Sequence, residues 1–148
     1  MKNIAKFLFV FSLVSLFLIS CDPDDDNQNT NTPAAAGFTW RENDANAEVK
    51  TAGSSEVRTQ YKSIFAFSGA TATSGTLFEI NLTDIATGTY AIGGSNAFYF
   101  NGNTATPTSG EVIITSNSNG KASGTFKAFW GSGTITSVYG TFTDIPVN

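Results

Sequence analysis

The feature that most limits how this chain can fold is a pair of strand-like segments on either side of an Asn-Gly turn. Residues 112–115 are largely apolar, and residues 122–130 place Phe126, Ala128 and Trp130 on one parity with Lys127 and Phe129 on the other. Between them, residues 117–120 read Asn-Ser-Asn-Gly. An Asn-Gly pair readily adopts the positive φ angles that a tight hairpin turn requires. The pattern predicts an antiparallel hairpin.

Shorter segments with strand character recur along the chain between clusters of Gly, Asn, Ser and Thr. Residues 64–67 are apolar on both parities, which predicts a central strand covered on both faces. Residues 44–56 fit either a short helix or a weak strand. The further strands that we expect are 38–41, 57–67, 77–82, 88–93, 98–100 and 134–142, the last with an extension to residue 145.

Seven or eight short strands with regularly spaced turns predict an all-β domain over residues 37–148. Two architectures fit this pattern, a single antiparallel β-sandwich or a small closed barrel. The composition is consistent with an all-β domain, because aromatic residues, which favour strands, make up 13% of the chain and charged residues only 14%. The domain is of a size for one hydrophobic core.

The first twenty residues have the layout of a secretion signal. Lys2 and Lys6 precede an apolar stretch at 7–19, which is shorter than the roughly 20 residues that span a bilayer. The stretch ends in Leu-Ile-Ser-Cys at 18–21, which resembles the lipobox of bacterial lipoproteins. The alternative is an ordinary secretory signal with a chance cysteine.

The lipobox resemblance implies cleavage between Ser20 and Cys21 and attachment of a diacylglycerol to the Cys21 thiol. Further acylation of the new amine, for example with palmitate, would give two or three chains, which anchor a protein stably where one does not. Cys21 is the only cysteine. An internal disulfide is therefore excluded, and we expect a membrane partner through the lipid.

Residues 21–36 contain no aromatic or β-branched aliphatic residue, so we expect a flexible acidic tether. Its acidic cluster is either a solvated charge run or a match to the export signal of Bacteroidota surface lipoproteins, which it resembles. The resemblance implies an outer-membrane domain that faces the exterior. A calcium site is a third interpretation, but this segment lacks the turn glycine and the spaced oxygen ligands that such sites need. The cluster consists of Asp22, Asp24, Asp25 and Asp26.

The charge balance excludes one class of partner. Lys2 and Lys6 leave with the signal, so six of the eight basic residues remain against twelve acidic ones, a net charge of about −6. An acidic chain with no basic patch is a poor nucleic-acid binder. We therefore expect no nucleic-acid partner.

Most enzyme chemistry is also excluded. The chain has no histidine, and its one cysteine is assigned to lipid, so Ser-His-Asp and Cys-His nucleophiles and His-based zinc sites are absent. We expect no catalytic, cofactor-binding or metal-binding residue. A carboxylate pair of the glycosidase kind is the one route left, although solvent-facing charges are the simpler reading. The candidate carboxylates are Glu79, Asp84, Glu111 and Asp144.

Four aromatic residues could form a stacking platform for a sugar ring: Trp40, Phe129, Trp130 and Tyr139. Strand parity assigns most of them to the core. Phe129 is the exception, because it shares its parity with Lys127 and would be an exposed contact.

Several segments resemble small Bacteroidota lipoproteins grouped as DUF6252, a domain of unknown function. The similarity covers residues 37–148 and is most specific at Gly88-Thr89-Tyr90, Ser123-Gly124-Thr125-Phe126 and Gly140-Thr141-Phe142. It implies an exported, lipid-anchored, β-rich domain and no particular chemistry.

Together these features predict a non-catalytic binding or accessory module in the cell envelope, with a glycan or an envelope protein as its partner. One alternative is a small barrel that carries an apolar ligand, motivated by the thirteen phenylalanines. The other is a carboxylate-based glycan hydrolase.

Overall fold

The computed structural model describes residues 35–148. The predictions for the signal peptide and for Ser20, Cys21, Asp22, Asp24, Asp25 and Asp26 lie outside these residues. None of the described residues forms a helix with the length and apolar character needed to cross a bilayer.

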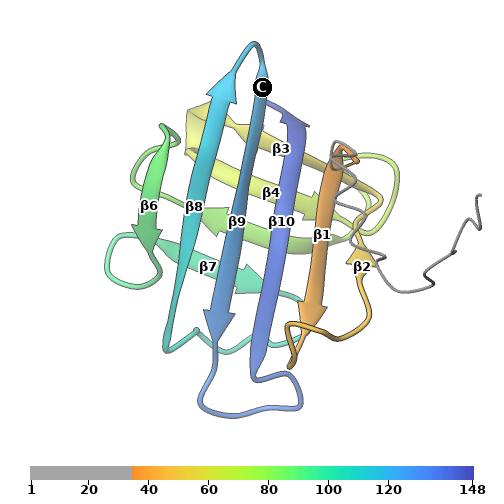
Figure 1. The fold of residues 1–148 in the computed structure, drawn as a ribbon, viewed down its shortest axis with the longest axis vertical. Helices are drawn as coiled ribbons and strands as arrows, with labels where there is room; N and C mark the ends of the chain where they lie inside the picture. The colour runs from red at the N-terminus through yellow and green to blue at the C-terminus, as the bar shows by residue number, and fades with distance from the viewer. Residues whose placement is uncertain (1–34) are drawn as a thin grey trace, which may run out of the picture. The chain divides into compact units, whose positions relative to one another are not determined.

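The described chain forms two antiparallel sheets packed face to face (Figure 1). The larger sheet has the strand order β2-β1-β10-β9-β8-β6, and the smaller has the order β3-β4-β5-β7. The strands are β1 (Gly37–Glu42), β2 (Lys50–Thr51), β3 (Ser54–Arg58), β4 (Ser63–Phe67), β5 (Thr76–Asn81), β6 (Gly88–Ala91), β7 (Ala97–Phe100), β8 (Ser109–Ser118), β9 (Lys121–Phe129) and β10 (Ser137–Pro146).

The predicted all-β antiparallel fold is confirmed, and of the two architectures the sandwich forms. The sheets remain separate and do not close into a barrel. In Figure 1 the strands of the smaller sheet cross behind those of the larger one at a steep angle, as in orthogonal sheet packing. Residues 35–148 hold ten strands rather than seven or eight, because β2 adds a two-residue strand and one predicted strand is divided in two.

The predicted hairpin is β8 and β9. Ser118 pairs with Lys121, and the two residues between them, Asn119 and Gly120, have φ angles of 54° and 71°. Two consecutive positive φ angles are what a type I′ turn needs. The alternation is also confirmed, because Phe126, Ala128 and Trp130 are buried while Lys127 and Phe129 face outward.

The prediction of one strand over 57–67 is wrong. The 3-10 turn Thr59–Tyr61 and Lys62, at φ 50°, reverse the chain, so that β3 and β4 pair as a hairpin. No glycine, asparagine or proline marks this turn, so nothing in the composition signalled it. Residues 63–67 are nevertheless buried throughout and form an interior strand, as expected. Residues 44–56 contain the weak strand β2 and no α-helix.

The core between the sheets consists mainly of aromatic rings, with Phe78 on β5 at its centre. Its ring centroid lies 5.0 Å from that of Phe38, 4.5 Å from that of Phe100 and 5.5 Å from that of Phe126. All four of these side chains are almost fully buried. The phenylalanine-rich composition therefore fills the space between the sheets.

Two glycines on the inner face of the larger sheet make room for rings on the neighbouring strand. Gly124 on β9 pairs with Phe142 on β10, and Gly140 on β10 pairs with Phe126 on β9. Each phenylalanine ring lies where the Cβ of the opposite residue would be. The Gly-Thr-Phe sequences at 124–126 and 140–142 thus pair with each other in antiparallel register, and their two threonines face outward together.

Candidate functional site

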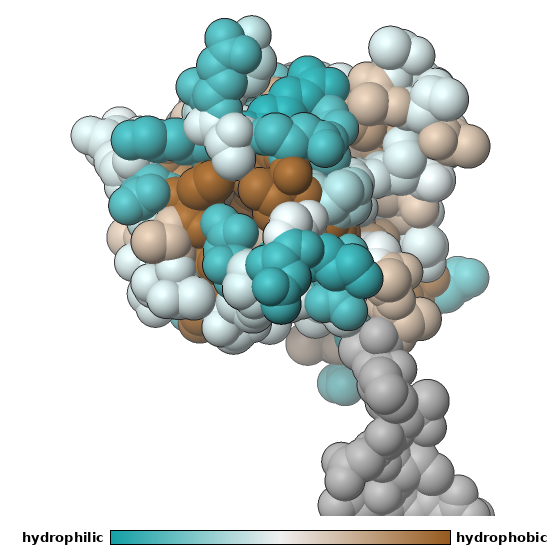
Figure 2. Space-filling view, turned by 90° about the horizontal axis from the view of Figure 1, so that it is seen from above, coloured by the Kyte–Doolittle hydropathy of each residue, from teal (hydrophilic) through white to brown (hydrophobic). Residues whose placement is uncertain are grey.

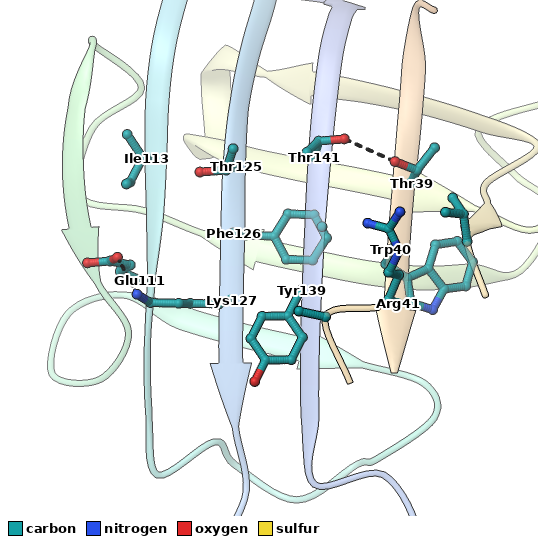
Figure 3. Close-up of a pocket in the computed structure, with 13 residues that line it drawn as sticks. Thr39, Trp40, Arg41, Glu111, Ile113, Thr125, Phe126, Lys127, Tyr139 and Thr141 are labelled. Carbon is teal, nitrogen blue, oxygen red and sulfur yellow. Dashed lines mark hydrogen bonds and ion pairs between the residues drawn. The ribbon is translucent and has the colours of Figure 1, made fainter. Parts of the chain in front are cut away.

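A groove of about 400 Å³ lies on the outer face of the larger sheet (Figure 3). Two rows of outward side chains cross its strands. The first row contains Thr39, Thr141, Thr125 and Ile113 from β1, β10, β9 and β8. The second row contains Arg41, Tyr139, Lys127 and Glu111 from the same four strands. Register alone brings these eight residues together.

The shape of the groove follows from the inward glycine and phenylalanine. Phe126 and Gly140 are paired residues between the two rows, and both face the core. They therefore contribute mainly backbone to the outer face, and the short Thr125 and Thr141 side chains stand beside them. The β1–β2 connection supplies Ala45 and Val49 as a wall, and 46% of Val49 is exposed.

The charges in the second row are not equivalent. Lys127 Nζ lies 2.8 Å from Glu111 Oε1, so these two charges are paired. Arg41 Nε donates a hydrogen bond of 2.9 Å to the carbonyl oxygen of Ala47, which holds the β1–β2 connection against the strand. Within residues 35–148 no carboxylate pairs with Arg41. The groove therefore carries one positive charge that the described protein does not neutralise.

The four aromatic candidates separate into two groups. Trp40 and Trp130 belong to the core, with exposed fractions of 7% and 5%. Phe129 and Tyr139 lie together on the outer face, edge to face, with ring centroids 5.7 Å apart. Both are half-buried, so Phe129 supports the Tyr139 ring rather than standing free. A platform of all four rings does not form.

The two glutamates among the four candidate carboxylates do not form a catalytic pair. Glu111 lies in the groove, whereas Glu79 lies on the outer face of the smaller sheet. The Asp144 carboxylate accepts a hydrogen bond from the Ser123 hydroxyl, which itself accepts one from the Asp144 amide. Asp84 lies near Tyr90, whose pKa is raised above its ordinary value by burial and, to a smaller degree, by the Asp84 charge. Glu79 and Glu111 are thus separated by the whole sandwich.

A second pocket, of about 480 Å³, lies on the outer face of the smaller sheet, and its lining includes Arg58, Tyr61, Phe65 and Glu79. The one guanidinium in this lining, that of Arg58, already interacts with neighbouring side chains. Arg58 lies 4.5 Å above the Phe65 ring and is paired with Glu56. This pocket therefore offers a ligand fewer unsatisfied polar groups than the groove does.

Apolar side chains also reach the surface at the end of the sandwich near the β8–β9 turn. Figure 2 shows them in a hollow surrounded by polar residues. The half-buried Ile85 and Val147 are held at this end, because the Asn117 side chain donates to the Ile85 carbonyl and the Val147 amide donates to the Gly120 carbonyl. Nothing in the described residues indicates what would cover this hollow.

The sequence did not predict Arg41 or the threonine row as site residues. Thr39 and Thr141 are 102 residues apart in the chain, yet their hydroxyl oxygens lie 3.0 Å from each other. The repeated Gly-Thr-Phe was the one available signal, because antiparallel pairing of each glycine with the opposite phenylalanine places the two threonines side by side.

No protein family, curated protein or solved structure matches the chain. Among residues 35–148, no group of three or more histidine, cysteine, aspartate or glutamate residues is placed to hold a metal ion. The groove is the candidate site that we consider further.

Proposed function

We propose that this chain is a lipid-anchored outer-membrane lipoprotein whose sandwich is a non-catalytic binding or accessory module, with the groove as its binding surface. One observation carries this proposal. The outer face of the larger sheet presents a half-buried tyrosine between the Arg41 guanidinium, which pairs with no carboxylate of residues 35–148, and a Lys127–Glu111 pair, next to a row of threonine hydroxyls. Such a mixture of one ring and several hydrogen-bonding groups is typical of a surface that orients a polar ligand.

The two alternatives have less support in the geometry. An apolar carrier needs free interior volume, whereas the rings between the sheets pack against one another, and both pockets described above open on outer faces. A glycosidase of the usual kind needs two carboxylates within about 5–9.5 Å of each other, and Glu79 and Glu111 are on opposite sides of the sandwich.

The anchor belongs to the same proposal. Cleavage before Cys21 and lipidation of its thiol would hold the module at the outer membrane, and the acidic residues that follow would direct it to the exterior, as the resemblance of these sequence segments to the lipobox and export signal of Bacteroidota surface lipoproteins implies. The groove would then meet a glycan or an envelope protein at the cell surface.

Replacing Cys21 by alanine is expected to abolish incorporation of labelled palmitate and to release the chain from the membrane fraction, because this thiol is the proposed lipid acceptor. A Ser15→Ala variant alters the apolar stretch outside the lipobox and should keep both label and fractionation. Label that persists without Cys21 would contradict the anchor. Digestion of the Ser15→Ala chain by protease added to intact cells would support the outward orientation, and full protection would contradict it.

Replacing Tyr139 by alanine is expected to weaken ligand capture by the anchored protein about tenfold, because the half-buried ring is a large part of the binding surface. Capture would be measured with surface glycan and envelope-protein fractions, using the wild type as reference. Tyr99→Ala removes an exposed ring from the other sheet and should change nothing. Equal capture by both variants, with unfolding curves unchanged, would contradict the assignment of the groove.

A further inference from the structure

Arg41 distinguishes the groove from the rest of the described surface. Residues 35–148 contain three ion pairs: Lys50–Glu42, Arg58–Glu56 and Lys127–Glu111. Arg41 takes part in none of them. Its Nε is held by the Ala47 carbonyl, which fixes the side chain and leaves the two terminal nitrogens available. In Figure 3 the guanidinium lies beside Thr39 and Thr141, at the edge of the groove.

Two further polar groups in the groove have no hydrogen-bond partner within the described residues: the Thr125 hydroxyl and the Tyr139 phenol. The Thr141 hydroxyl is bonded to Thr39 Oγ1 at 3.0 Å and keeps a further lone pair or proton for a ligand. A planar guanidinium matches the geometry of a carboxylate, which it can bind with two parallel hydrogen bonds. The arrangement therefore favours a ligand that carries a carboxylate and several hydroxyl groups.

The position of the groove on a sheet face favours a saccharide over a peptide. Peptides that join a sheet bind along an edge strand, where backbone groups are unpaired. Here β10 and β9 lie between other strands, β6 covers β8 at residues 111–114, and β2 covers β1 at Thr39 and Trp40, so most backbone groups beneath the groove are used within the sheet. Side chains must therefore make most of the contacts with a ligand, and hydroxyls, charged groups and one half-buried ring match the surface of a sugar.

We infer that the groove binds an acidic saccharide, with the carboxylate of a uronate residue on Arg41 and a sugar ring against Tyr139. This inference rests on the proposed binding function and adds the chemical class of its ligand. The neutral Lys127–Glu111 pair at the far end of the row supplies a donor and an acceptor for ring hydroxyls. Arg41 then provides the charge that selects an acidic sugar over a neutral one.

Calorimetry with the purified mature chain would test the inference, using tetragalacturonate as probe and its methyl ester as the matched neutral ligand. We expect tetragalacturonate to bind and esterification to weaken binding about tenfold or more, because a charge-assisted hydrogen-bond pair is lost. Arg41→Gln should weaken tetragalacturonate binding by a similar factor and leave the affinity for the ester unchanged. Lys121→Gln removes another exposed positive charge from β9, outside the groove, and should have little effect.

Two results would overturn the inference. In the first, both ligands bind with equal affinity and only Tyr139→Ala weakens their binding. The groove then binds sugars without recognising the carboxylate, and the proposed function still holds. If neither ligand binds, but an acidic peptide binds in an Arg41-dependent manner, the ligand is a protein segment rather than a sugar. The proposed function itself fails only if Tyr139→Ala leaves all capture by the anchored protein intact.

Discussion

Replacing Phe78 by alanine is expected to lower the free energy of unfolding by about 3–5 kcal/mol. The Phe78 ring is fully buried and contacts rings from both sheets, including Trp40 at 5.2 Å and Phe98 at 5.9 Å between centroids. Removing it leaves a cavity that the surrounding strands cannot close, because each is fixed by its own ladder of hydrogen bonds. Domains of this size are typically stable by about 5–15 kcal/mol, so a large part of that stability would be lost.

Urea unfolding of the domain, followed by tryptophan fluorescence, would measure this loss, since both Trp40 and Trp130 are buried. Phe78→Leu keeps most of the volume and is expected to lose roughly 1–2 kcal/mol. Tyr99→Ala, on the neighbouring strand with 40% of its surface exposed, should change stability by no more than about 0.5 kcal/mol. If Phe78→Ala and Tyr99→Ala unfold at the same urea concentration, Phe78 is not the centre of the core.

The fold could be predicted from the sequence where strand alternation and turn composition agreed. Asn119-Gly120 marked the β8–β9 hairpin because those residue types tolerate the required φ angles. The turn at residues 59–62 has no such residues, and Val57 and Phe65 share one parity, so the sequence pattern predicts a single strand through this turn. In fact Phe65 faces outward under Arg58. A turn of ordinary residues is specified by the strands that it joins, not by its own composition.

The site was less predictable because it depends on pairing between distant strands. Parity correctly placed Phe129 on the outer face with Lys127, but it gave no indication that Tyr139 would be its neighbour. Arg41 joins them only because β1 pairs with β10 at the far end of the chain. Cross-strand register determines which polar side chains meet, and single-sequence patterns contain little information about register between distant strands.

Replacing Gly124 by alanine is expected to destabilise the domain by about 3 kcal/mol, through overpacking. Elsewhere in a strand, exchanging glycine for alanine usually stabilises by roughly 0.5–1 kcal/mol, so the expected effect has the opposite sign. A Cβ at Gly124 would lie against the backbone oxygen of Ile113 and against the Phe142 ring, closer than real Cβ atoms come to such neighbours. Gly131→Ala is the matched control, because the nearest atom to its added Cβ is a Thr108 methyl at 3.8 Å.

A double-mutant cycle separates the two contacts that the added methyl would make. In a Phe142→Leu background the ring contact is removed, so any loss that Gly124→Ala still causes comes from the Ile113 carbonyl, which cannot rotate away. We expect Gly124→Ala to lower the free energy of unfolding by less in this background than in the wild type. The loss that is left should still be clearly larger than the loss caused by Gly131→Ala. A cost identical in both backgrounds would mean that the ring does not occupy the space over Gly124. The pairing of the two Gly-Thr-Phe segments, and with it the register that places Thr125 beside Thr141, would then have to be rejected.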